Sequence, residues 1–237
     1  MRALTSAVTD SDEERARLDS AVKASDGFFT TFFVSPYSKY IARWAARHGI
    51  TPNQVTLVSG AVGALAAAAF ATGQRAGLVA GGVLLQAAFT LDCVDGQLAR
   101  YTRTFSRLGA WLDSMLDRGK EYLVYAGLAI GASRAGDTVW LLAGAALALQ
   151  TTRHAVDFSY PAFERSRGVA ARGRPAGDRS ALGWAKKVVA FPIGERFAAI
   201  SLSAALFTPA TTFIVLLSWG GLAAAYVFLG RSVRASA

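Results

Sequence analysis

Four aspartates lie close together in an otherwise apolar part of the chain, and their spacing predicts two pairs. Asp92 and Asp95 are three residues apart, and Asp113 and Asp117 are four residues apart. On a helix, either spacing places both carboxylates on one face. Buried acids repel one another unless a cation neutralises them, and a pair of divalent cations does this best. Carboxylate ligands favour Mg²⁺, Mn²⁺ or Ca²⁺ over zinc.

Small residues accompany both acid pairs. Gly96 and Ala99 each lie one turn after an acid of the first pair, and Gly109 lies one turn before the second pair. Such a flat strip lets a planar group approach the backbone closely. Arg100 adds a cation suited to phosphate at the end of the strip. Metals, a flat surface and a cation together suggest a nucleotide diphosphate held by its phosphates.

The complete pattern from Asp92 to Asp117, D-x2-D-G-x2-A-R-x8-G-x3-D-x3-D, resembles the signature of the CDP-alcohol phosphotransferases, and every signature residue is present. The resemblance implies an enzyme of phospholipid biosynthesis that moves a substituted phosphate group from a CDP-alcohol to an acceptor alcohol and releases CMP. Asp117 is implied as the general base for the acceptor hydroxyl. The implied ligands of two Mg²⁺ or Mn²⁺ ions are Asp92, Asp95, Asp113 and Asp117. The implied nucleotide-binding residues are Asp92, Gly96, Ala99, Arg100 and Gly109.

The composition places this motif in an all-α, polytopic membrane protein. Of the 237 residues, 53% are hydrophobic, and they gather in runs that approach the roughly 20 residues needed to cross a bilayer. Thr51 and Pro52 predict the N-cap and first residue of the first span, and Thr208–Pro209 predicts the turn into the last one. The six predicted transmembrane helices cover about 54–72, 76–99, 109–132, 139–160, 187–207 and 211–230.

Two segments of different character precede the transmembrane domain, which we place at 51–237. Residues 1–27 are polar and acidic, and we expect a short soluble helix or a disordered tail without chemistry of its own. Residues 28–50 carry aromatic side chains on one side and cations on the other. That pattern is typical of an amphipathic helix lying in the membrane surface, and a helix packed on a partner protein is the alternative.

The distribution of Lys and Arg predicts the orientation in the cytoplasmic membrane. With the N-terminus in the cytoplasm, Arg75 and Arg134 are the only ones of the 25 basic residues in external loops. Both termini and the active site then face the cytoplasm, where a soluble nucleotide can reach the acids. Topology thus explains the net charge of +9, and no stacking or groove-reading motif supports nucleic acid as a partner.

Two arginines fall inside the later predicted spans. An unpaired Arg in a bilayer costs about 2.5–3.5 kcal/mol, so Arg153 and Arg196 should face the interior or a wet cavity. A structural ion pair with an acid such as Asp157 or Glu195 is the alternative reading.

A second resemblance concerns the acceptor. The stretches 157–160 and 194–197 are similar to the corresponding parts of the inositol-phosphate-using members of the family, which implies a basic pocket for the acceptor's phosphate. For Lys187, snorkelling to lipid headgroups is an alternative. The implied acceptor-binding residues are Arg153, Arg196, Ser159 and Lys187.

The sequence leaves several points open. The donor is of the CDP-diacylglycerol or the CDP-inositol type, and the acceptor is inositol phosphate first and glycerol phosphate second. A homodimer is expected only by analogy with the family. The alternative function is a divalent-cation transporter that uses the intramembrane acid pairs, although both pairs sit at one predicted membrane face.

Overall fold

The computed structural model describes residues 12–167, 178 and 180–236, and within these every regular element is helical. The predicted all-α class is therefore confirmed. Residues 12–20 form a helical segment, and the first eleven residues of the predicted tail lie outside the described part. The later elements are the π-helix η1 (Thr30–Val34) and the α-helices α2 (Ser35–Arg47), α3 (Pro52–Phe70), α4 (Arg75–Thr102), α5 (Arg107–Arg134), α6 (Trp140–Ser166), α7 (Ala181–Val189), α8 (Ile193–Leu206) and α9 (Pro209–Ser236).

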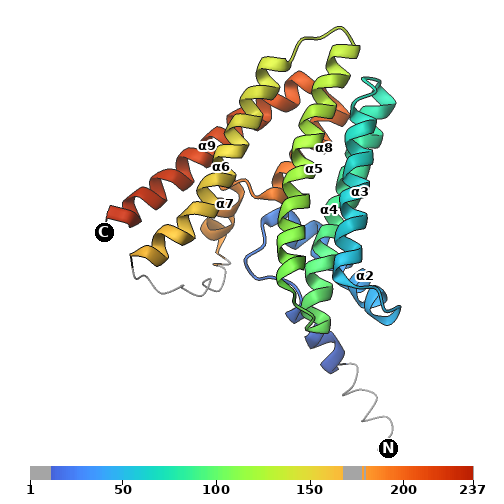
Figure 1. Cartoon of the computed structure of the whole chain (residues 1–237), viewed down its shortest axis with the longest axis vertical. Coiled ribbons are helices and arrows are strands. Elements are labelled where there is room, and N and C mark those ends of the chain that lie inside the picture. The colour runs from blue at the N-terminus through green and yellow to red at the C-terminus, as the bar shows by residue number, and fades with distance from the viewer. Residues whose placement is uncertain (1–11, 168–177, 179, 237) are drawn as a thin grey trace, which may run out of the picture.

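The long helices form two groups that diverge at one end (Figure 1). Helix α3 packs on both α4 and α5, and α8 packs on the outer side of α4. Helices α6 and α9 run together and lean away from the α3–α5 group, as Figure 1 shows. The acid pairs therefore belong to one tight helix group, because both α4 and α5 are held by α3.

Glycines of α5 let it approach α3 at backbone distance. A methyl group at Gly127 would overlap the carbonyl oxygen of Ala67, and one at Gly131 would overlap that of Phe70. Small residues at a helix crossing permit this close packing. The contact fixes α5 against α3 along its length, which in turn fixes the level of the acids at its other end.

Both helix starts near the acids are capped, and the cap of α3 is the one that its sequence predicts. The Thr51 hydroxyl accepts from the backbone N–H of Gln54, whose side chain accepts in return from the Thr51 N–H at 2.8 Å. Pro52 is the first residue of α3, so this part of the prediction is confirmed. Ser106 caps α5 by accepting from the N–H of Gly109 at 2.8 Å.

The predicted fifth span is not one helix, which corrects the sequence-based boundary of 187–207. Helices α7 and α8 meet at an angle of 66° across a short break. Phe191 has a φ of 50°, and Pro192 follows it without an N–H to continue the helix. The break leaves backbone carbonyls without their helical partners, and arginines from α6 and α8 supply donors to them, as described below.

Within the part of the chain that the structure describes, three helices are long and apolar enough to cross a membrane: Pro52–Phe70, Arg75–Thr102 and Pro209–Val233. The bent pair α7–α8 is a fourth if it counts as one span. Helices α5 and α6 are of similar length but carry more charged and polar side chains. These lengths and compositions agree with a polytopic membrane protein, while the number of six spans stays a prediction.

Helix α2 has the two faces that its sequence predicts. Tyr37, Tyr40 and Trp44 are about half exposed, at 47%, 54% and 54%. On the cationic side, Lys39 and Arg43 bind acids of the helical segment 12–20. The aromatic face is thus available to a membrane surface, and the cationic face is covered by the chain's own N-terminal segment.

Candidate active site

Three of the four motif acids converge. Asp92 and Asp95 on α4 and Asp113 on α5 each place a carboxylate oxygen within 4.8 Å of the others. The i,i+3 spacing puts the α4 pair on one face, and the packing of α4 and α5 on α3 brings that face toward Asp113. Such a set of oxygen ligands fits one hard divalent cation such as Mg²⁺ or Mn²⁺.

A threonine on α3 orients the most buried of these acids. Asp95 is 5% exposed, and its Oδ2 accepts a 2.6 Å hydrogen bond from the hydroxyl of Thr56. Thr56 also lies within 3.0 Å of the carbonyl oxygen of Pro52, one turn earlier. A ligand held in this way has its remaining oxygen directed to the metal position before the ion arrives.

The fourth acid, Asp117, has a different partner. The ammonium of Lys120 lies 2.9 Å from Oδ1 of Asp117 and 2.6 Å from Oδ1 of Asp92. Asp117 does not belong to the group of three converging acids. Sequence reasoning missed Lys120, although its position one turn after Asp117 on an apolar helix was the available signal.

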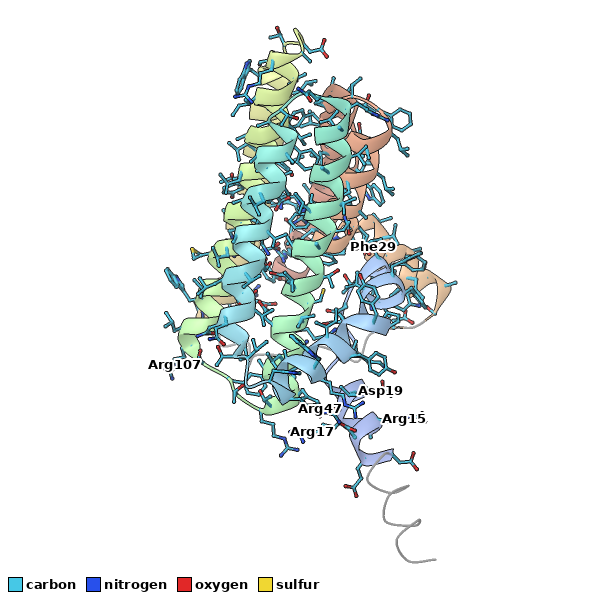
Figure 2. All side chains as sticks on the ribbon, turned by 90° about the vertical axis from the view of Figure 1, so that its right-hand side faces the viewer. Arg15, Arg17, Asp19, Phe29, Arg47 and Arg107 are labelled. Atoms are coloured by element: carbon cyan, nitrogen blue, oxygen red, sulfur yellow. The ribbon has the colours of Figure 1, made fainter. Side chains whose placement is uncertain are left out.

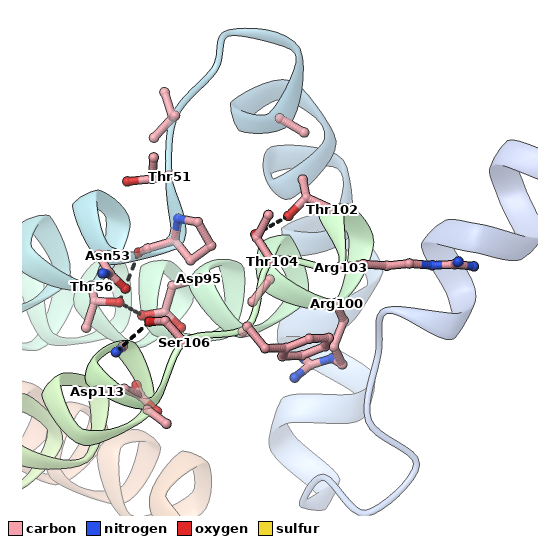
Figure 3. A pocket seen from close by; sticks show the side chains of 18 of the residues that line it. Thr51, Asn53, Thr56, Asp95, Arg100, Thr102, Arg103, Thr104, Ser106 and Asp113 are labelled. Carbon is pink, nitrogen blue, oxygen red and sulfur yellow. Dashed lines mark hydrogen bonds between the residues drawn. The ribbon is translucent and has the colours of Figure 1, made fainter.

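A pocket of about 690 Å³ opens beside the three acids (Figure 3). Its wall includes Gly96, Ala99 and Gly109, together with Arg100, which are four of the predicted nucleotide-binding residues. Figure 3 shows Asp95 and Asp113 at one side of the pocket. The four small or cationic residues of the motif thus share one cavity with two of the acids, while Asp92, which was also predicted to bind the nucleotide, is not among the residues that line it.

Two polar residues of the pocket escaped the sequence analysis. A Cβ on Gly109 would lie 2.6 Å from Oδ1 of Asn53 and 2.8 Å from Oγ of Ser106. Both side chains line the pocket, and they come from the first residues of α3 and from the N-cap of α5. Their place depends on how the two helix starts meet, so no local sequence signal announces it. They place polar atoms beside Gly109, where an added methyl group would have to displace them.

The N-terminal segment, to which the sequence assigned no chemistry, closes one side of this site. Arg100 donates from Nε to the carbonyl oxygen of Ala21, and Lys23 lines the pocket. Arg17 donates to the carbonyl oxygen of Tyr101 at 2.7 Å. Figure 2 shows this segment at the end of the bundle where α2 ends and α5 begins, near Arg47 and Arg107. The segment therefore packs over the C-terminal end of α4.

The two arginines predicted for the acceptor site meet at the break between α7 and α8. Arg196 donates to the Phe191 carbonyl at 2.9 Å, and Arg153 lies 3.3 Å from the same oxygen and 2.9 Å from that of Ala190. Arg196 also pairs with Glu121 of α5, at 2.8 and 3.2 Å. The alternative reading anticipated a structural ion pair but named the wrong acids, because Asp157 pairs with Arg231 instead.

The other two residues predicted for the acceptor site lie apart from these arginines. Ser159 is exposed, and its hydroxyl lies 3.5 Å from the carbonyl oxygen of Val156 in its own helix. Lys187 donates to the carbonyl oxygens of Ala24 and Asp26 in the N-terminal segment, at 3.2 and 3.0 Å. Of the four predicted acceptor-binding residues, therefore, Arg153 and Arg196 share a hydrogen-bond acceptor, and Ser159 and Lys187 bond elsewhere.

A second, smaller cavity adjoins Arg153. It measures about 290 Å³ and lies between α6 and α9, with Asp157 also in its wall. Nη1 of Arg153 is buried and makes no hydrogen bond with any residue that the structure describes. The guanidinium of Arg153 therefore has an N–H donor that is free to bind a ligand, whereas Arg196 already forms an ion pair with Glu121.

Comparison with known proteins agrees with the motif. The model of the CDP-alcohol phosphatidyltransferase family matches residues 49–233. A bifunctional IPC transferase and DIPP synthase of Rubrobacter xylanophilus is 32% identical over 173 residues, which cover 70% of this chain and 33% of the relative. An archaetidylinositol phosphate synthase of Pyrococcus horikoshii is 37% identical over 101 residues, or 43% of this chain and 52% of the relative. The chain therefore spans between a third and about half the length of these curated relatives.

Solved structures share the fold. The phosphatidylinositol phosphate synthase of Mycobacterium tuberculosis with CDP-DAG bound superposes with a TM-score of 0.55 at 22% identity, covering 82% of this chain and 90% of that one. The same enzyme in complex with manganese and citrate gives a TM-score of 0.53 at 21% identity, with 80% and 86% covered. At such identities the likeness concerns the arrangement of helices. Because the family model matches most of its length and the acids of the signature converge, the chain belongs to the CDP-alcohol phosphatidyltransferase family.

Proposed function

We propose that residues 51–237 form a transferase domain that moves a substituted phosphate group from a CDP-alcohol to an acceptor alcohol, releases CMP and serves phospholipid biosynthesis. One observation carries the proposal. The converging acids Asp95 and Asp113 lie in the wall of a pocket that is also lined by the small residues of the motif and by Arg100. A nucleotide diphosphate needs these three elements side by side: a metal position, a flat surface and a cation.

The reaction follows from the roles of these residues. A divalent cation held by Asp92, Asp95 and Asp113 would neutralise the donor's diphosphate and the charge on the departing CMP. The acceptor oxygen forms a bond to phosphorus while the bond from phosphorus to the CMP oxygen breaks. Asp117 takes the proton of the acceptor hydroxyl and passes it to solvent. A carboxylate is a weak base, so positioning by the surrounding helices supplies part of the rate.

The substrates follow from the membrane setting and the later arginines. Apolar helices beside the pocket favour a lipid-linked donor, CDP-diacylglycerol, over a small donor such as CDP-inositol. The reserve donor of Arg153 favours a phosphorylated acceptor, inositol phosphate before glycerol phosphate. The name of the Pyrococcus relative, an archaetidylinositol phosphate synthase, points to an inositol-containing product, which supports this order.

The topology completes the proposal. We place six spans in the cytoplasmic membrane, with both termini and the pocket on the cytoplasmic side and two units paired as a homodimer. Figure 2 supports the orientation, since Arg15, Arg17, Arg47 and Arg107 all lie at the end of the bundle that holds the N-terminal segment. Cytoplasmic ends of membrane proteins collect such basic residues.

The direct test is CMP release by the purified protein in lipid or detergent with Mg²⁺ or Mn²⁺. CDP-diacylglycerol and CDP-inositol are offered separately, each with inositol phosphate, glycerol phosphate or serine. We expect release with one pair, loss in Asp117→Asn, and retention in the control Asp137→Asn, since Asp137 is an exposed acid between α5 and α6. Metal flux into liposomes without CMP release from any pair would instead support the cation pathway.

A further inference from the structure

Lys120 is an unusual side chain to find in a divalent-metal site. It is 2% exposed, and its ammonium lies within hydrogen-bond distance of Asp92 and Asp117. A third partner comes from α3, where Oγ of Ser59 accepts at 2.9 Å. A buried ammonium is tolerated only when it is paired and hydrogen-bonded, and here it donates hydrogen bonds to Asp92 and Ser59 and forms an ion pair with Asp117.

The surrounding helices are shaped for this lysine. A Cβ on Gly63 of α3 would lie only 2.5 Å from Cγ and 2.8 Å from Cδ of Lys120, so glycine makes the slot in which the lysine stem lies. Ser59 donates its own proton to the carbonyl of Ala88 at 2.9 Å, which leaves its oxygen lone pairs for the ammonium. Helix α3 thus helps to position both the stem and the tip of Lys120, in addition to the two acids.

This arrangement divides the four acids unequally. Asp95 and Asp113 form no ion pair with Lys120. Asp92 does form one, through Oδ1, and it also belongs to the group of three converging acids. A second dication between Asp92 and Asp117 would stand beside the ammonium. Like charges at such distances in a buried site are strongly unfavourable.

We propose that Lys120 is a built-in cation that takes the place of a second divalent ion, so that the domain binds one divalent cation, at Asp92, Asp95 and Asp113. The inference rests on the metal site of the proposed function and replaces the two-ion site expected from the sequence. Lys120 bridges Asp92 and Asp117, neutralises charge between them and holds the Asp117 carboxylate in place for the acceptor.

The test is the number of Mn²⁺ ions bound per chain, without nucleotide, by equilibrium dialysis and by electron paramagnetic resonance. The wild type should bind one ion and show the hyperfine pattern of an isolated Mn²⁺. Lys120→Met keeps an unbranched stem for the slot beside Gly63 but removes the charge. It should double the bound Mn²⁺ and give the spectrum of an exchange-coupled pair. Lys39→Met, which breaks a Lys–Asp pair on α2 away from the site, should still bind one ion.

Two results would overturn the inference: two ions in the wild type, or a single ion in both Lys120→Met and Lys120→Gln. The wild-type spectrum decides the first point even where a variant fails to fold. The CMP assay separates this inference from the proposed function. One ion in the wild type and two in the variant, with no CMP release from any substrate pair, would leave the inference standing and refute the function. Two ions with normal CMP release would do the reverse.

Discussion

Thr56 offers a sharp test of the metal site because it holds a predicted metal ligand without being a predicted ligand itself. Its hydroxyl lies 2.6 Å from Oδ2 of Asp95, and the threonine is 3% exposed. In Thr56→Val the side chain keeps its shape while the hydrogen bond to the carboxylate disappears. We expect weaker binding of Mn²⁺, since the carboxylate must then be ordered by the ion itself.

The magnitude follows from the type of hydrogen bond. A hydrogen bond to a charged group contributes about 1.5–3 kcal/mol, which corresponds to roughly 12- to 150-fold in an equilibrium constant. Loss of an outer partner of a metal ligand typically costs about 10- to 100-fold in metal affinity. Both routes predict that the Kd for Mn²⁺ rises by between one and two orders of magnitude in Thr56→Val, and that Thr56→Ser stays close to the wild type.

The assay is Mn²⁺ titration of the purified protein, followed by electron paramagnetic resonance of the free ion. Thr56 also contacts the carbonyl of Pro52, so a control must remove a bond of that kind away from the acids. Thr212→Val serves, because Thr212 is fully buried on α9 and its hydroxyl lies 3.3 Å from the carbonyl of Thr208. An unchanged Kd in Thr56→Val, or an equal rise in Thr212→Val, would refute the reasoning that Thr56 orients a metal ligand.

Three further variants address the substrates. Gly109→Ala should raise the donor KM at least about tenfold, because its methyl group would crowd Oδ1 of Asn53 in the pocket; an unchanged donor KM in steady-state CMP release would contradict the placement of the nucleotide. Arg153→Gln should lower kcat/KM for a phosphorylated acceptor by about 12- to 150-fold and leave the donor KM unchanged, since its free donor binds the acceptor's phosphate. Arg196→Ala should lower thermal stability, because Glu121 stays buried without its partner; since Glu121 already neutralises Arg196, the acceptor KM should change no more than the donor KM. A rise in the acceptor KM well above that in the donor KM would instead assign the acceptor's phosphate to Arg196 as well.

Local sequence signals predicted the parts of the site that depend on one helix at a time. The spacing of Asp92 and Asp95 required only helical periodicity, and the start of α3 required only the capping preferences of Thr51 and Pro52. Both predictions are confirmed by the structure. The small residues Gly96 and Ala99 likewise line the expected pocket, because they lie on the same helix as the acids.

Local sequence signals could not predict the parts of the site that depend on how the helices pack together. Lys120 reaches Asp92 only because α4 and α5 both pack on α3, and Asn53 enters the pocket only because the starts of α3 and α5 lie together. The N-terminal segment was assigned no chemistry, yet its backbone accepts from Arg100. These contacts join positions far apart in the sequence, and no local period encodes them.

The fifth predicted span shows why a broken helix belongs at the acceptor side of the site. A continuous apolar helix would satisfy its own carbonyls and give Arg153 and Arg196 no acceptors in the membrane interior. The break at Phe191 frees carbonyls that bind both arginines, and Glu121 balances the charge of Arg196. Because the ion pair with Glu121 already neutralises Arg196, we expect the phosphate of the acceptor to bind at Arg153. The break thus provides hydrogen-bond acceptors for both arginines. Arg196 then has a structural role, and Arg153 keeps a charge that can bind the acceptor.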